Sequence, residues 1–135
     1  MKPKVFIDSD VILDLLAQRR PFYDDAAKIF TQAYKKSIEI HTMAVVFTNV
    51  FYILRKINGS KVAREQLKNL RLLVRILPIT ESITDMALNS KINDFEDGLQ
   101  YFAAKENGIQ AIVTRNIKDY VIKGLTIQTP REYLI

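Results

Sequence analysis

Three short clusters of carboxylate, amide and hydroxyl side chains could do chemistry in this chain. The first is Asp8-Ser9-Asp10, which directly follows an apolar run. The second is the acidic stretch 93–97, and the third is the polar segment 114–120, which also follows an apolar run. Oxygen ligands of these kinds select Mg²⁺ or Mn²⁺ over zinc. Together the clusters indicate a divalent-metal site.

Each cluster also has an ordinary structural explanation. Asp10 can cap a helix that begins at Val11, and acids at 93–97 suit the positive end of a helix dipole. A turn with an Asx hydrogen bond would account for Asn116. Asp8 fits such explanations less well, because a carboxylate directly after a buried strand is costly unless it is paired, hydrogen-bonded or bound to a cation.

The elements that must position these clusters follow from apolar periodicity. The segments expected to form strands are 4–7, 37–41, 72–79, 111–113 and 124–128. The segments expected to form helices are 11–16, 23–34, 43–57, 62–70, 80–89 and 95–106. Strands that alternate with helices predict an α/β fold, a three-layer α/β/α sandwich with a central parallel sheet of four to five short strands.

Several local details of this fold are also expected. Pro21 suits the first turn of its helix, and Thr42 can cap the next one. The segment 43–57 is apolar nearly all round, which predicts a buried central helix. Gly59 should supply a left-handed turn after it, and Ser60 should cap the following helix.

The predicted sheet brings the three clusters together. In open parallel sheets, functional residues gather beyond the carboxyl ends of the strands. Asp8 and Thr114 both follow predicted strands, and Asp97 lies near the start of a helix. Several carboxylates in one crevice repel each other unless a divalent cation neutralises them.

Composition limits which classes of protein the chain can belong to. The 135 residues, 48% of them hydrophobic, fit one domain spanning 1–135. The chain has no cysteine, which excludes disulfides and zinc-finger chemistry. Neither a signal peptide nor an apolar run of membrane-spanning length is evident, so a cytoplasmic protein is expected. The net charge of +5 favours a polyanionic partner but is also common on ordinary protein surfaces.

These clusters, in this order and spacing, resemble the PIN-domain family, particularly the VapC-like toxin ribonucleases of bacterial toxin–antitoxin pairs. The resemblance covers essentially the whole chain. The segments that carry it are 5–14, Arg20-Pro21-Phe22-Tyr23, 52–56, Asp94-Phe95-Glu96-Asp97 and 114–120. It implies a Mg²⁺- or Mn²⁺-dependent endoribonuclease that acts on RNA, pairs with a cognate antitoxin and forms a homodimer.

The resemblance also implies roles for individual residues. Asp8 would be the central metal ligand, and Asp97 would be the ligand at the start of the late helix. Asn116 and Asp119 would supply the last position, directly or through water. Thr114 would be a hydroxyl that supports the ligands, and the bound ions would activate a water and stabilise charge on the scissile phosphate.

One position departs from the family pattern. The family usually has a glutamate on the central helix, where this chain has Asn49. An asparagine can coordinate through its carbonyl oxygen, but it carries no negative charge and cannot act as a base. Asp10 stands where the family more often has asparagine, which leads to the hypothesis that Asp10 is a metal ligand restoring part of the missing charge.

Two other features could carry function. His41, the only histidine, could act as a general base, although a hydrogen-bonded structural role is the more common one. Six basic residues could bind RNA phosphates or simply form a solvated helix face: Lys56, Lys61, Arg64, Lys68, Arg71 and Arg75.

Two alternative functions remain open at this point. Asn49 favours a catalytically degenerate PIN domain that binds RNA or a protein partner without cleavage. Asp8-Ser9-Asp10 after a strand also imitates a haloacid-dehalogenase-like phosphatase, although the chain offers no matching lysine motif.

Overall fold

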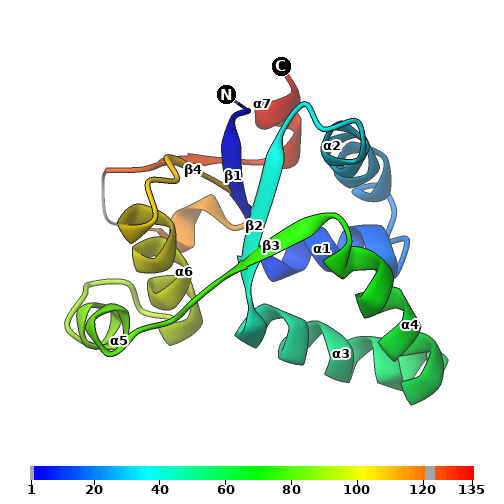
Figure 1. The fold of residues 1–135 in the computed structure, drawn as a ribbon, viewed down its shortest axis with the longest axis horizontal. Helices are drawn as coiled ribbons and strands as arrows, with labels where there is room; N and C mark the ends of the chain where they lie inside the picture. The colour runs from blue at the N-terminus through cyan, green and yellow to red at the C-terminus, as the bar shows by residue number, and fades with distance from the viewer. Residues whose placement is uncertain (1, 121–123) are drawn as a thin grey trace.

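A single five-stranded parallel sheet forms the centre of the molecule (Figure 1). The computed structural model describes residues 2–120 and 124–135. In the sheet the strands are ordered β3-β2-β1-β4-β5, and every neighbouring pair is parallel. The strands are β1 (Lys4–Ile7), β2 (Glu39–Met43), β3 (Val74–Leu77), β4 (Ala111–Val113) and β5 (Thr126–Gln128).

Helices cover both faces of this sheet, which confirms the predicted three-layer fold. Helices α1 to α4 lie on one side and α5 and α6 on the other (Figure 1). The helices are α1 (Ser9–Leu16), α2 (Tyr23–Tyr34), α3 (Ala44–Asn58), α4 (Ser60–Arg71), α5 (Glu81–Leu88), α6 (Phe95–Glu106) and α7 (Pro130–Leu134), with a short 3₁₀ helix, η1 (Ile117–Asp119). None of the helices in the described ranges is long and apolar enough to span a membrane.

The strand order creates a switch point between β1 and β4. From β1 the chain continues to β2 on one side, whereas from β4 it continues to β5 on the other. In the register, Ile7 pairs with Val113, and the Asp8 amide donates to the Val113 carbonyl at 3.0 Å. The first residues after both strands, Asp8 and Thr114, therefore lie beside the crevice where ligands bind in open α/β sheets.

Apolar side chains on the inner faces fix this arrangement. Val5, Phe6 and Ile7 of β1 are fully buried because the central strand is covered on both sides. On α3, buried Val46, Val50 and Leu54 recur at four-residue spacing. Burying each such side chain stabilises the fold by about 1.5 to 3 kcal/mol before the entropy of ordering is subtracted.

Two expectations for the central helix are wrong. Helix α3 is not buried all round, because it packs against α1, α4 and β2 along one stripe, and Tyr52, Ile53 and Ile57 are exposed. Thr42 is not its cap: it is a fully buried residue of β2, and Met43 occupies the capping position without a side-chain hydrogen bond.

Other local details were only partly anticipated. Gly59 has φ 85°, as its turn position required, but Ser60 is the first residue of α4 and makes no cap hydrogen bond. Pro21 precedes α2, whose capping position is Phe22. Strand β3 is half as long as the segment 72–79, because Leu72 and Leu73 complete the turn after α4.

Helix α7 was not predicted, although its start carries a clear signal. Thr129 accepts a hydrogen bond from the Glu132 amide, and the Glu132 carboxylate accepts one from the Thr129 amide. With Pro130 at the first helical position, this is a capping box. The segment places the end of the chain against α2 and β5.

Candidate metal and active site

Asp8 lies at the carboxyl end of β1 and is fixed from two sides. Its side chain accepts hydrogen bonds from the Ser9 amide at 2.6 Å and from the Thr114 hydroxyl at 2.8 Å. Asp8 is 5% exposed, and Thr114 is fully buried. Within residues 2–120 and 124–135, this buried carboxylate has hydrogen-bond donors but no ion-pair partner, which makes it a strong candidate to bind a cation.

Asp97 reaches the same place from the first turn of α6. Asp94 caps this helix by accepting from the Asp97 amide at 3.0 Å. The Tyr120 hydroxyl lies 3.4 Å from Asp8 Oδ2 and 3.5 Å from Asp97 Oδ1. A hydroxyl has one proton, so it can donate to only one of these carboxylates at a time. The structure thus brings Asp8 and Asp97 together around Tyr120.

Gln100 supports this pair from one turn further along α6. Its amide nitrogen donates to the Tyr120 hydroxyl at 2.8 Å and to Asp97 Oδ1 at 3.2 Å. Gln100 is fully buried, and its Oε1 atom has no hydrogen-bond partner among the residues that the structure describes. A buried amide oxygen without a partner is costly and gives the site a further unused oxygen.

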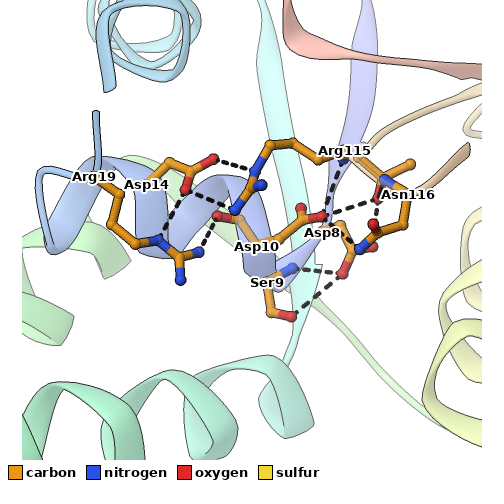
Figure 2. Close-up of polar contacts among 8 residues, drawn as sticks. Asp8, Ser9, Asp10, Asp14, Arg19, Arg115 and Asn116 are labelled. Carbon is orange, nitrogen blue, oxygen red and sulfur yellow. Dashed lines mark hydrogen bonds and ion pairs between the residues drawn. The ribbon is translucent and has the colours of Figure 1, made fainter. Parts of the chain in front are cut away.

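Asp10 also borders the crevice, where it contacts the segment that follows β4. One oxygen, Oδ2, accepts from the Arg115 amide at 3.0 Å and from the Asn116 side chain at 3.2 Å (Figure 2). In the described part of the chain, the other oxygen, Oδ1, is buried without a hydrogen-bond partner. This orphaned carboxylate oxygen leaves Asp10 with free capacity for a cation.

Asn49, the departure from the family pattern, contacts an acid on a different helix. Its side-chain amide donates a hydrogen bond to Glu96 Oε1, so α3 and α6 meet at this pair. Both residues are partly buried. Where the family usually carries a glutamate on the central helix, this chain therefore has a glutamate from α6 held by an asparagine.

Burial and mutual repulsion raise the pKa values of these acids. Burial, followed by the Asp8 charge, raises the pKa of both Asp97 and Glu96 to about 7. The same two causes raise the pKa of Asp10 to about 6. Burial beside these acids also raises the pKa of Tyr120 far above its ordinary value, which keeps its hydroxyl protonated.

These residues fit a divalent cation by donor type and charge. All the donors are oxygens, and a cation would relieve the repulsion that raises the pKa values. Within residues 2–120 and 124–135, however, no three Asp, Glu or His side chains already form a single-ion site. The Tyr120 hydroxyl lies between Asp8 and Asp97, so direct coordination by both requires side-chain movement.

A second carboxylate network lies next to the site. Asp14 on α1 is fully buried, and its oxygens receive Arg19 Nε at 2.9 Å and Arg115 Nε at 2.8 Å. Arg115 also donates through a second nitrogen at 3.2 Å, and Arg19 donates to the Asp10 carbonyl at 3.1 Å (Figure 2). One negative charge therefore holds two guanidinium groups.

The remaining candidate residues lie in different settings. Asp119 is exposed in η1, close enough for its charge to raise the pKa of Asp97. His41 is away from the crevice and hydrogen-bonds Glu39 at 2.7 Å, which agrees with its structural interpretation. Asn116 is exposed and turned towards Asp10.

Several residues of the site were not singled out from the sequence. They are Asp14, Glu96, Gln100, Arg115 and Tyr120. Two had a usable signal: Asp14 is the one acid in the apolar run 11–16, and Gln100 follows Asp97 by three residues on a helix. Glu96, Arg115 and Tyr120 lie within two of the polar clusters, but only the folded chain shows what their side chains contact.

Comparison with known proteins agrees with this geometry. The family model described as "PIN domain" matches residues 4–118. Ribonuclease VapC1 of Aquifex aeolicus (strain VF5) is 27% identical over 135 residues, covering 96% of this chain and 92% of that protein.

Solved structures share the fold at lower identity. VapC20 of Mycobacterium tuberculosis, described as a sarcin-ricin loop cleaving toxin, superposes with a TM-score of 0.65 at 18% identity, covering 80% of this chain and 86% of that one. A toxin–antitoxin complex from Klebsiella pneumoniae gives a TM-score of 0.67 at 21% identity, covering 93% and 97%. The family match spans most of the chain, including every described strand up to β4 and all three polar clusters except Asp119 and Tyr120. The chain therefore belongs to the PIN-domain family.

Proposed function

We infer that this protein is a divalent-metal-dependent endoribonuclease. The observation that carries the inference is the convergence of Asp8 and Asp97, 89 positions apart in the sequence, at the switch point of the sheet. Support comes from Ribonuclease VapC1 and from VapC20, whose names describe RNA-cleaving proteins. The family assignment argues against the phosphatase alternative.

Asp8, Asp97 and Glu96 are the residues that would hold Mg²⁺ or Mn²⁺, with Asp10 and its orphaned oxygen at the border. When bound, such an ion supplies an activated water and neutralises charge on the scissile phosphate. Thr114 orients Asp8 through its hydrogen bond of 2.8 Å. Asn116 orients Asp10 through a hydrogen bond from its side-chain amide, and Asp119 adds negative charge from the exposed rim.

Glu96 is the better candidate to replace the charge that Asn49 lacks. Its carboxylate is held directly by the Asn49 amide. Asp10, for which the sequence suggests the same compensation, contacts Arg115 and Asn116 in the segment after β4. Substitution of Glu96 by Gln should therefore reduce Mn²⁺ affinity more than substitution of Asp10 by Asn, as measured by calorimetry.

A toxin role with a cognate antitoxin and a homodimer is the biological setting we propose. Support comes from the toxin–antitoxin complex of Klebsiella pneumoniae. The chain also has an apolar groove of about 510 Å³ between α3, α4 and β3, suited to a protein partner. Its lining includes Phe47, Phe51, Tyr52, Leu67 and Ile76, with Arg64, Lys68 and Arg71 among its polar residues.

RNA cleavage tests the activity directly. The full chain is incubated with a structured RNA in Mn²⁺ or in EDTA, together with the variants Asp8→Asn and Asp97→Asn. Cleavage should require Mn²⁺ and fall at least roughly hundredfold in each variant, since each removes a ligand charge. Asp8, and not Asp10, is the N-cap of α1, and asparagine is also a good helix cap, so Asp8→Asn leaves the start of α1 intact.

The matched control is Asp85→Asn, which makes the same change at an exposed position on α5. It should cleave at the wild-type rate. Cleavage that persists in Asp8→Asn would be contamination and would remove the proposal. RNA binding without any Mn²⁺-dependent cleavage would favour the second candidate, a degenerate PIN domain, which Asn49 and the incomplete ion site also favour.

A further inference from the structure

A pocket of about 420 Å³ opens directly beside Asp10. It lies between the turn before α2, the segment after β4 and the start of α7. Its lining residues are Pro21, Phe22, Asp25, Arg115, Asn116, Thr129, Pro130 and Arg131. Arg115 and Asn116 both donate to Asp10 Oδ2, so the pocket and the carboxylate crevice share a wall.

The pocket wall carries a preformed stack of a guanidinium on an aromatic ring. The Arg115 Cζ atom lies 3.9 Å from the centre of the Phe22 ring. Phe22 is 39% exposed, and the Arg115 side chain is 28% exposed, so both retain surface towards the pocket. Guanidinium planes and aromatic faces are the surfaces on which unpaired bases stack.

The charge of this wall is fixed by the Asp14 network. Asp14, Arg19 and Arg115 together carry one net positive charge, and the nearby Asp10 carboxylate interacts with Arg115. The bonds from Asp14 to Arg115 also hold the guanidinium in place, so little side-chain entropy is lost when a phosphate binds it. Arg131 also lines the pocket, where it forms an ion pair with Asp25 at 3.2 Å.

We propose that this pocket binds a nucleotide of single-stranded RNA adjacent to the scissile phosphate, with Phe22 and Arg115 contacting its base and phosphate. The proposal rests on the inferred ribonuclease activity for its substrate class. A flat, cationic and aromatic wall fits a nucleotide better than an acidic peptide, which would use the charge but not the ring. The volume is also within the range of small-molecule sites.

Binding of a fluorescein-labelled single-stranded RNA tests the pocket separately from cleavage. Fluorescence anisotropy is measured on the full chain in EDTA, so that no metal-dependent turnover occurs. Phe22→Leu keeps an apolar side chain but removes the ring, and it should weaken the RNA Kd about tenfold. Arg115→Lys keeps the charge but loses the planar fork, and it should weaken the Kd by roughly fivefold.

Arg20→Gln is the matched control, because Arg20 is exposed, precedes Pro21 and does not line the pocket. It removes one positive charge and should change the Kd by less than about twofold. If Arg115→Lys unfolds, Phe22→Leu still decides the question, since its partly exposed ring contributes little to the core.

The outcomes separate the two proposals. Wild-type binding and cleavage in Phe22→Leu would overturn the pocket and leave the ribonuclease standing. RNA binding that depends on the Phe22 ring, in a chain that never cleaves RNA in Mn²⁺, would support the pocket and overturn the ribonuclease. A third outcome is that an acidic peptide displaces the labelled RNA as well as unlabelled RNA does, and equally in wild type and Phe22→Leu. That result would assign the surface to a protein partner and overturn the nucleotide site.

Competition with inorganic phosphate, at matched ionic strength, tests whether the pocket recognises the base as well as the phosphate. It lacks a base and should displace the labelled RNA much less effectively than an unlabelled RNA of the same sequence. Equal displacement by phosphate would show that the pocket recognises only an anion, which would overturn the role given to Phe22.

Discussion

Two neighbouring groups of carboxylates in this molecule differ in the side chains that contact them. Asp14 is fully buried, yet two guanidinium groups satisfy it at 2.8 and 2.9 Å. Asp97 and Glu96 are only partly buried, form no ion pair with any residue that the structure describes, and have pKa values raised to about 7. The two groups therefore differ in whether an arginine contacts the carboxylate.

The chain contains enough basic residues to pair with both groups of carboxylates. It contains 20 Lys and Arg against 15 Asp and Glu, and two of the arginines converge on Asp14 alone. Leaving the acids around Asp8 without such partners costs stability, which is a common feature of functional sites. A structural network and a candidate ion site can thus be told apart by their partners.

Removing the Asp14 charge should give the largest effect on stability. Asp14→Asn leaves Arg19 and Arg115 without a counter-charge and should lower the free energy of unfolding by about 2 to 4 kcal/mol. Urea unfolding followed by circular dichroism measures this loss. Asp85→Asn, an exposed change of the same kind, should shift stability by less than about 0.5 kcal/mol, and an equal loss in both would erase the contrast.

Mn²⁺ should stabilise the protein by an amount that grows with pH. The ion binds deprotonated carboxylates, and the pKa values of Asp10, Glu96 and Asp97 lie at about 6, 7 and 7. At a hundredfold excess over its Kd, the ion should add about 2.7 kcal/mol at pH 8 and little at pH 5. Differential scanning fluorimetry at both pH values measures this, and an equal shift in Asp8→Asn would contradict it.

Asp97→Asn should stabilise the metal-free protein, the opposite sign to Asp14→Asn. A carboxyl whose pKa is raised to about 7 contributes its stability below the unfolded pKa and loses it as pH rises through 7. At pH 8 the variant should therefore gain about 1 to 2 kcal/mol, after allowance for solvent screening. At pH 4 the gain should vanish, and a loss of stability at pH 8 would show that the cluster is already satisfied.

The smallest effect should come from His41 and Glu39. Burial lowers the pKa of His41, and the hydrogen bond to His41 lowers that of Glu39. Because both pKa values are lowered in the folded state, each residue contributes stability above its unfolded pKa, and this stability is lost as pH falls through the folded pKa. His41→Gln should therefore flatten the decline in stability between pH 7 and pH 4 by less than about 1 kcal/mol, measured by urea unfolding, and should leave RNA cleavage unchanged.

The sequence by itself determined the layers of this protein. Short apolar runs separated by helical periods encode strands and helices, and parallel strands require crossovers, so the α/β sandwich follows from local pattern. The same logic placed Asp8 and Thr114 at strand ends and Asp97 near them. Thr42 and the segment 43–57 were misread, because composition does not reveal which side of a helix its neighbours cover.

Only the tertiary structure decided the partners of each charged group. Nothing in the spacing says that Arg115 reaches Asp14, 101 positions away, while the Asp97 carboxylate contacts Tyr120 and Gln100. Those pairings depend on side-chain direction at the ends of different elements, which a linear pattern does not encode. Local periodicity is set by neighbours along the chain, whereas the electrostatics of a site are set by neighbours in space.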